Sequence, residues 1–193
     1  MGLRRGGPGL GATGWTRRIG QDLTFKIDYL DPDRYGVQVD GLPDGFYTKS
    51  IHAGEADVLY SGVDLTSRAP AEVEILVSPK AGLVFGVVRN PDANQPAPGA
   101  TVVLVPNDKQ RLAIPAFYHQ AASDQRGRFN FKNVAPGDYK VYAWEDVEST
   151  AWMDPEFMKP LESKGEAVTV AENAQATVQI NLIPARSERQ LGQ

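Results

Sequence analysis

The chain has 193 residues, 41% of them hydrophobic and 23% charged, so it can bury one or two cores and is not disordered overall. It lacks cysteine, which excludes disulfides, thiolate catalysis and cysteine-ligated metals. The net charge of −4 makes the surface repel phosphate backbones, and no long apolar run is present, so we expect neither nucleic-acid binding nor membrane insertion.

Residues 1–19 are rich in glycine and arginine and show no strand or helix period. The charges of Arg4 and Arg5 resemble the start of a secretory signal, but no apolar region follows them. We therefore expect a flexible leader over residues 1–19.

Residues 20–80 carry a pattern that returns further along the chain. Tyr35 follows an Asp-Pro-Asp-Arg turn, and 104 positions later Tyr139 follows an Ala-Pro-Gly-Asp turn. Solenoid repeats have periods of roughly 20 to 50 residues, so this spacing indicates a duplicated domain. The first copy starts where the second is already on its fourth strand. We therefore expect a truncated repeat whose open β-edge pairs with other protein modules or with further copies of the chain.

Residues 81–185 contain short bursts of β-branched and aromatic residues between Pro, Gly, Asp and Asn, the pattern of an all-β sandwich. One short helix is expected, with Asp154 as N-cap, Pro155 at its first position and Pro160 at its end. Residues 186–193 are expected to form a polar tail. Seven strands are predicted, at 83–89, 100–106, 117–122, 128–131, 137–145, 166–170 and 177–183.

Two turns and two tyrosines are expected to have structural roles. Gly127 ends an Asp-Gln-Arg-Gly turn and can adopt positive φ, and Pro136 with Gly137 has the preference of a type II turn. Tyr35 and Tyr139 occupy the same position after their turns, which predicts a hydroxyl bonded to upstream backbone, as in a tyrosine corner. A ligand-binding role for these tyrosines is the alternative.

The motifs of residues 82–184 resemble the carboxypeptidase regulatory-like domain. They are GLVFGVV at 82–88, PGATVVL at 98–104, DQRGRF at 124–129 and PGDY at 136–139. The resemblance implies a seven-stranded Greek-key β-sandwich of the transthyretin-like (prealbumin-like) type, preceded by a partial sandwich of the same type. It also implies a noncatalytic module without a cofactor, in bacterial secreted, periplasmic or outer-membrane proteins, and hence an extracytoplasmic location.

Aromatic residues gather in the strand and crossover after the second turn. Tyr142, Trp144, Trp152 and Phe157 are the candidate ligand-binding residues. Exposed, their rings could stack on a sugar. Buried, they would form a satellite core under the crossover, and both interpretations stay open.

No catalytic or metal site is predicted. His52 and His119 are the only histidines and lie outside any ligand motif. Asp92 and Asn94 have the alternating spacing of calcium ligands but lack the rest of that pattern, so turn capping is favoured. The transthyretin-like hydroxyisourate hydrolases end in a Tyr-Arg-Gly-Ser tail that the last residues here do not match.

The sequence therefore predicts a noncatalytic structural, adhesive or protein-interaction module of a bacterial cell-envelope or secreted protein. It is expected to self-assemble through the open β-edge of residues 20–80. A carbohydrate-binding module with exposed aromatic residues near Trp144 and Trp152 is the alternative.

Overall fold

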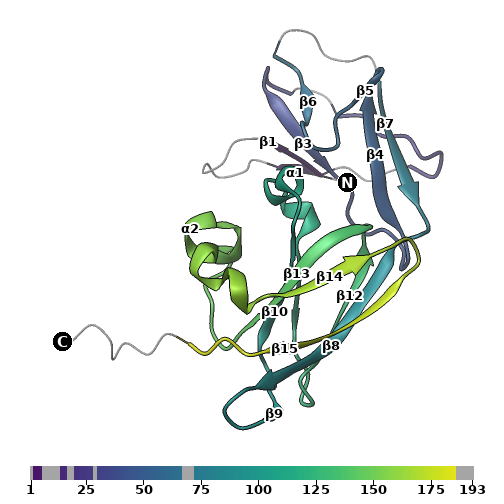
Figure 1. Ribbon diagram of the computed structural model, residues 1–193. Helices are drawn as coiled ribbons and strands as arrows, with labels where there is room; N and C mark the ends of the chain where they lie inside the picture. Colours follow the sequence, from purple (N-terminus) through teal and green to yellow (C-terminus); the bar gives the residue numbers. More distant parts are fainter. Residues whose placement is uncertain (1, 6–13, 17–19, 28–29, 67–71, 186–193) are drawn as a thin grey trace. The chain divides into compact units, whose positions relative to one another are not determined.

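The computed structural model describes residues 2–5, 14–16, 20–27, 30–66 and 72–185. They belong to two compact units, Met1–Lys80 and Ala81–Gln193, which we call unit 1 and unit 2 (Figure 1). The predicted polar tail at 186–193 lies outside the described residues.

Unit 2 is an all-β sandwich of two sheets, as the strand-and-turn pattern predicts. One sheet has the order β11-β10-β13-β14, and the other has the order β12-β8-β15 with β9 paired to β8. The strands are β8 (Gly82–Asn90), β9 (Gln95–Pro96), β10 (Thr101–Pro106), β11 (His119–Ala122), β12 (Arg128–Val134), β13 (Gly137–Trp144), β14 (Glu166–Val170) and β15 (Gln175–Asn181). All seven predicted strands are present, and the ends of all but β14 are shifted.

The main core lies between the two sheets and follows from alternation along the strands. On β8, Val84 and Val88 are fully buried, whereas Phe85 faces outward and is 36% exposed. Leu104 and Val141 from the other sheet belong to the same buried cluster. Removing these apolar side chains from water is the main favourable contribution to folding.

Strands β8 and β15 are parallel and lie close together at Gly86. Their register runs from Leu83 opposite Gln175 to Arg89 opposite Asn181. A Cβ on Gly86 would overlap the carbonyl oxygen of Val178 and would come within 2.8 Å of the Phe129 ring. Only glycine therefore fits here without a shift of β15.

The chain joins the two sheets directly after β15. The Leu182 amide donates to the Arg89 carbonyl in one sheet at 2.8 Å, and the Ile183 amide donates to the Ala143 carbonyl in the other at 2.8 Å. One end of the sandwich is thus closed by main-chain hydrogen bonds.

The turn before β12 has the predicted geometry. Gly127 has a φ of +72°, and its amide donates to the Asp124 carbonyl at 2.8 Å. The Asp124 carboxylate accepts the amides of Arg126 and Arg128, each at 2.8 Å. A Cβ at Gly127 would lie 2.6 Å from the Val88 carbonyl oxygen, so the position favours glycine for two reasons.

The turn before β13 is fixed by side chains. The Tyr139 hydroxyl donates to the Ala135 carbonyl at 2.8 Å, and Arg111 donates to the Pro136 carbonyl at 2.8 Å and to the Tyr139 hydroxyl at 3.3 Å. Gly137 has a φ of +155°, well beyond the +80° or so of a type II turn, so the predicted turn type is wrong although glycine is favoured.

Short helices occupy the two long connections of unit 2. They are α1 (Lys109–Leu112) and η1 (Pro115–Phe117) between β10 and β11, and η2 (Ala151–Met153), α2 (Pro155–Met158) and η3 (Lys159–Lys164) between β13 and β14. Asp154 caps α2 as predicted, accepting the Glu156 amide at 2.9 Å. α2 ends at Met158, shortly before Pro160 as predicted. The chain then continues directly as the 3-10 helix η3, and Pro160 lies in its first turn, where the amide it lacks would have no partner.

A satellite core covers the outer face of the four-stranded sheet of unit 2. Tyr142 and Trp144 stack with ring centroids 5.5 Å apart, and Trp152 from η2 lies 6.3 Å from Trp144. Phe157 on α2 is the fourth ring of this cluster, with its centroid 6.5 Å from that of Trp144. Figure 1 shows the segment that carries α2 beside β13 and β14.

Unit 1 contains two small sheets, with the orders β2-β1-β3-β6 and β5-β4-β7. Its strands are β1 (Gly2–Arg5), β2 (Gly14–Thr16), β3 (Arg34–Gln38), β4 (Tyr47–Ala53), β5 (Ala56–Asp57), β6 (Val63–Asp64) and β7 (Val73–Ser78). Within the flexible leader expected over residues 1–19, the structure describes residues 2–5 and 14–16 alone, and these form β1 and β2. Strand β1 pairs with β3 through main-chain groups that need no apolar period.

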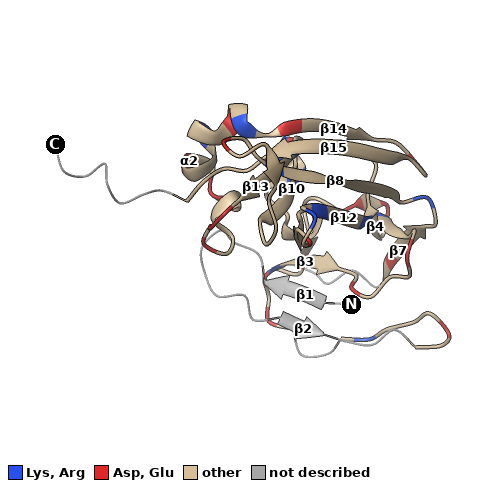
Figure 2. Ribbon diagram, turned by 90° about the horizontal axis from the view of Figure 1, so that it is seen from below, with Lys and Arg blue, Asp and Glu red and all other residues tan. Residues whose placement is uncertain are grey.

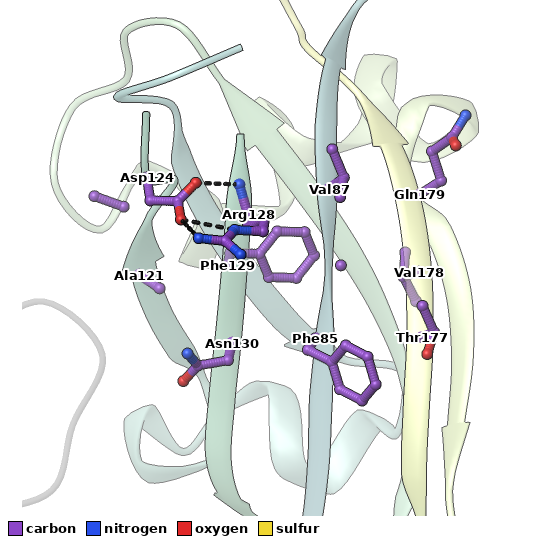
Figure 3. A pocket seen from close by; sticks show the side chains of 12 residues that line it. Phe85, Val87, Ala121, Asp124, Arg128, Phe129, Asn130, Thr177, Val178 and Gln179 are labelled. Carbon is purple, nitrogen blue, oxygen red and sulfur yellow. Dashed lines mark hydrogen bonds and ion pairs between the residues drawn. The ribbon is translucent and has the colours of Figure 1, made fainter. Parts of the chain in front are cut away.

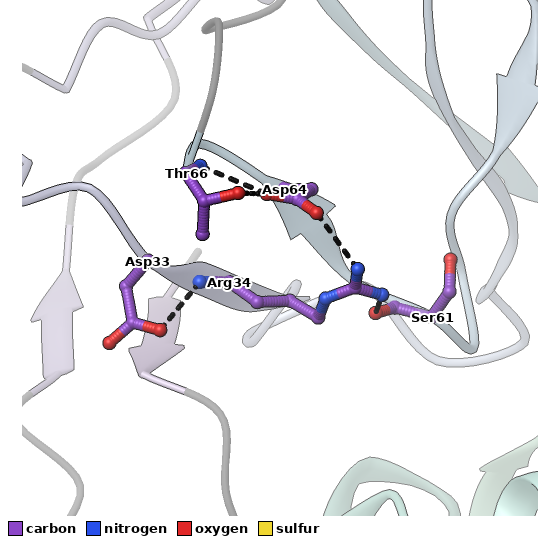
Figure 4. A network of polar contacts seen from close by, with 5 residues as sticks. All are labelled: Asp33, Arg34, Ser61, Asp64 and Thr66. Atoms are coloured by element: carbon purple, nitrogen blue, oxygen red, sulfur yellow. Dashed lines mark hydrogen bonds and ion pairs between the residues drawn. The ribbon is translucent and has the colours of Figure 1, made fainter.

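A network of polar contacts joins β3 and β6 in unit 1 (Figure 4). Arg34 donates to the Asp64 carboxylate at 2.8 Å and to the Ser61 carbonyl at 3.3 Å. Hydrogen bonds from the hydroxyl and amide of Thr66, together with Arg34, hold the pKa of Asp64 below its ordinary value. Next to this network, the fully buried Tyr35 donates its hydroxyl to the Asp31 carbonyl at 2.9 Å.

The Tyr139→Phe substitution should lower the unfolding free energy of unit 2 by about 0.5–1.5 kcal/mol, because it leaves the Ala135 carbonyl and Arg111 short of one partner each. Tyr118→Phe is the matched control, because its hydroxyl makes an exposed bond to the Leu112 carbonyl at 2.9 Å and should matter less. Urea unfolding followed by tryptophan fluorescence measures both. Equal losses in the two variants would contradict a structural role for Tyr139.

His119 makes unit 2 sensitive to acid. It faces the core opposite Leu104, with its ring 6.2 Å from that of Phe131, and burial lowers its pKa to about 4. The unfolded chain, with a histidine pKa near 6.5, binds the proton first. The contribution of the neutral His119 to the free energy of unfolding of unit 2 should therefore be fully present above about pH 6.5. That free energy should fall by about 3 kcal/mol in total as the pH drops to about 4. Urea unfolding at several pH values measures this loss, and His119→Gln should remove it. If proton NMR showed that His119 titrates near pH 6.5 in the folded protein, the predicted acid sensitivity would be wrong.

Candidate binding groove

An open groove crosses the three-stranded sheet of unit 2 on its outward side, and we call it the outer groove. It has a volume of about 720 Å³. Figure 3 shows its walls, which come from β8, β12, β15, β11 and the turn after β11. The lining residues are Phe85, Gly86, Val87, Ala121, Ala122, Asp124, Arg128, Phe129, Asn130, Thr177, Val178 and Gln179.

The strand register arranges six outward side chains of the groove in two rows. Residues directly opposite each other in a sheet point to the same face. Each row therefore has an apolar side chain on the central strand and polar side chains on both flanks. A strand spacing of about 4.8 Å makes a row about 10 Å wide and separates the rows by about 7 Å. The rows across β12, β8 and β15 are Asn130–Phe85–Thr177 and Arg128–Val87–Gln179.

Among the lining residues, only Asp124 and Arg128 carry charge, and they pair with each other. The Arg128 guanidinium donates to the Asp124 carboxylate through Nε at 2.9 Å, and its Nη2 lies 2.8 Å from the same oxygen. Hydrogen bonds from the backbone amide and the side chain of Arg128 lower the pKa of Asp124 from its ordinary value, so the pair stays ionic at neutral pH. Strand β15 has no charged residue and is drawn without red or blue (Figure 2). The groove therefore has no net charge.

The polar groups on the flanks are available to a ligand. The side chains of Asn130, Thr177 and Gln179 are exposed and form no hydrogen bond with another described residue. Phe85 adds an exposed aromatic ring between them. The arrangement offers apolar contact at the centre and hydrogen bonds at the sides.

The structure places the predicted ligand-binding residues elsewhere, in the satellite core. Tyr142, Trp144 and Trp152 are no more than 5% exposed, and Phe157 is half-buried. Of the two interpretations of the aromatic residues, the structure agrees with the buried satellite core, because the apolar crossover folds over the two tryptophans. The Nε1 of Trp144 is buried without a hydrogen-bond partner among the described residues.

The residues predicted to be structural do not line the groove. Gly127 and Tyr139 belong to the two turns already described, as do Pro136 and Gly137, and Tyr35 lies in unit 1. Sequence reasoning missed Phe85 because the apolar run of β8 suggests a strand buried on both faces. The sequence did contain a signal for this face of the sheet. Polar residues alternate with apolar ones on both neighbouring strands, with Arg128 and Asn130 on β12 and Thr177 and Gln179 on β15.

The described residues contain no group of three or more His, Cys, Asp or Glu side chains that could hold a metal ion together. His52 lies on β4 in unit 1 and His119 on β11 in unit 2. No helix in the described part of the chain is long and apolar enough to cross a bilayer.

Comparison with solved structures finds β-sandwich proteins of low sequence identity. The major pilin subunit of Bacillus cereus is 16% identical with a TM-score of 0.35, over 58% of this chain and 34% of the pilin. A Pseudomonas aeruginosa protein to which carbohydrate binding has been ascribed is also 16% identical, with a TM-score of 0.35 over 53% of this chain and 88% of its own. The 5-hydroxyisourate hydrolase of Klebsiella pneumoniae is 13% identical with a TM-score of 0.31, over 55% of this chain and 92% of the hydrolase.

No curated protein matches the sequence. The family model of the carboxypeptidase regulatory-like domain matches residues 84–183, which is half of the chain and contains every strand of the sandwich at least in part. The transthyretin-like sandwich implied by the sequence motifs is the fold of unit 2. The chain therefore belongs to the carboxypeptidase regulatory-like domain family, whose members are noncatalytic modules.

Proposed function

We propose that the chain is a noncatalytic binding module of a bacterial cell-envelope or secreted protein and that it binds its partner in the outer groove. The observation that carries the proposal is the exposed Phe85 at the centre of a sheet face, between the side chains of Asn130 and Thr177, which form no hydrogen bond within the described part of the chain. A ligand that covered Phe85 would remove apolar surface from water and supply those missing hydrogen bonds.

Two further features support this proposal. The groove volume of about 720 Å³ is within the range of about 300–1,000 Å³ usual for ligand sites. Asp124, the one acid among the lining residues, forms an ion pair with Arg128. Because its carboxylate is occupied in this way, the groove is better suited to binding a ligand than to catalysing a reaction on it. The family resemblance supports the extracytoplasmic location.

The edge of β7 in unit 1 is a second candidate surface, for pairing with another protein module or a further copy of the chain. Among the described strands, β7 pairs with β4 alone. Leu76 and Val77 on β7 are 48% and 37% exposed. An unpaired edge with exposed apolar side chains is a template for strand addition.

The groove can be tested without knowing its ligand. Methyl glycosides, dipeptides and small alcohols, titrated under NMR observation, should shift the amides of Phe85, Asn130 and Thr177, because small probes collect at real binding sites. Phe85→Ala should remove these shifts, and Leu112→Ala, at a residue 41% exposed elsewhere in unit 2, should not. Shifts that centre on the crossover, with quenching of Trp144 and Trp152 fluorescence, would instead favour Tyr142, Trp144, Trp152 and Phe157 as the site.

Self-association through β7 has its own measurement. The mass from light scattering during size-exclusion chromatography should rise with protein concentration, and Leu76→Lys should keep the protein monomeric by placing a charge on the edge. Leu112→Lys is the matched control and should behave as the unsubstituted chain. A monomer at every concentration would remove self-association and leave other modules as the partners of this edge.

A further inference from the structure

We propose that the ligand of the outer groove is an uncharged oligosaccharide, laid across Phe85 and Val87 with its hydroxyl groups on the flanking side chains. This inference rests on the proposed function of the groove and adds the chemical class of its ligand. It places the sugar on the three-stranded sheet and not on the aromatic residues of the satellite core.

The first argument is the charge of the groove. Asp124 and Arg128 neutralise each other at 2.8 Å, and the remaining lining residues are neutral. An anionic ligand would meet an arginine already paired, and a cationic ligand would meet an acid already paired. Displacing either partner would cost a charge-assisted hydrogen bond, so the groove favours a neutral ligand.

The second argument is the kind of polar group that is unpaired. Asn130 and Gln179 each offer an amide that donates and accepts, and Thr177 offers a hydroxyl that does both. Sugar hydroxyls also donate and accept, so each of these side chains can satisfy a hydroxyl in either direction. Groups of one polarity, such as a lysine cluster for phosphate, are absent from the lining residues.

The third argument is the order of apolar and polar groups across the sheet. Phe85 and Val87 lie side by side on the outward face of β8, with polar side chains on β12 and β15. A pyranose ring has an apolar face and a polar rim, which matches an apolar centre between hydrogen-bonding flanks. The two rows, about 10 Å by 7 Å, provide an area close to that of a disaccharide.

The test uses isothermal titration of the whole chain with three sets of probes. The neutral set is gluco-, manno-, galacto- and chito-oligosaccharides. The acidic set is oligogalacturonates and heparin fragments, and the third set is uncharged peptides. We expect binding from the neutral set, with an affinity that changes by less than about twofold when salt is raised, because no net charge is neutralised.

Substitutions then locate the binding. Phe85→Ala should weaken the neutral oligosaccharide by about tenfold or more through loss of the ring contact. Gln179→Ala should weaken it by about three- to tenfold through loss of hydrogen bonds. Gln175→Ala is the matched control, because Gln175 is also exposed and faces the same side of β15 but does not line the groove.

The outcomes separate the ligand class from the site. A preference for acidic oligosaccharides or peptides, an affinity that falls steeply with salt, or no oligosaccharide binding at all would overturn the inference. Small probes that still shift the groove amides in the unsubstituted chain but not in Phe85→Ala would then leave the proposed function standing. Neutral oligosaccharides that bind Phe85→Ala and Gln179→Ala as well as the unsubstituted chain would overturn both.

Discussion

The outer groove and the core behind it both depend on the close approach of β8 to β15 at Gly86. Because residue 86 has no side chain, the Phe129 ring packs across β8 from the inside, and the carbonyl of Val178 lies against the backbone from the neighbouring strand. The same approach fixes the parallel register that places Phe85 beside Thr177 and Val87 beside Gln179. A wider spacing between β8 and β15 would loosen the core. It would also move Thr177 away from Phe85 and Gln179 away from Val87, so both rows of the groove would widen.

The strands of unit 2 were predictable because alternation and turn chemistry act over a few residues. Gly127 and Asp124 form the predicted turn, and β14 has the predicted bounds, Glu166–Val170. The groove was not predictable, because the exposure of Phe85 depends on whether any segment covers its face of the sheet. The burial of Trp144 depends in the same way on the path of a crossover of about 20 residues, which no local pattern specifies.

Unit 1 shows the other limit of sequence reasoning. Strands β1 and β2 lie in glycine-rich sequence, and they form through main-chain pairing of β2 with β1 and of β1 with β3, without any apolar period. The tyrosine pattern was informative, because Tyr35 and Tyr139 each bond to the carbonyl four residues upstream. The strands that carry them also pair alike, with Tyr35 opposite Val63 on β6 and Tyr139 opposite Val168 on β14. Both observations support the proposal of a duplicated domain.

The parallel pairing of β8 with β15 also determines how unit 2 responds to tension. The chain enters the sandwich at the start of β8 and leaves it after the end of β15, at opposite ends of two neighbouring strands. A pull along the chain therefore slides these strands past each other and loads their hydrogen bonds together. The bonds of Leu182 and Ile183 to separate sheets pass part of that load to β13. Shear of this kind resists force better than the one-by-one opening of a hairpin, so the topology suits a module that must hold while its ends are stretched.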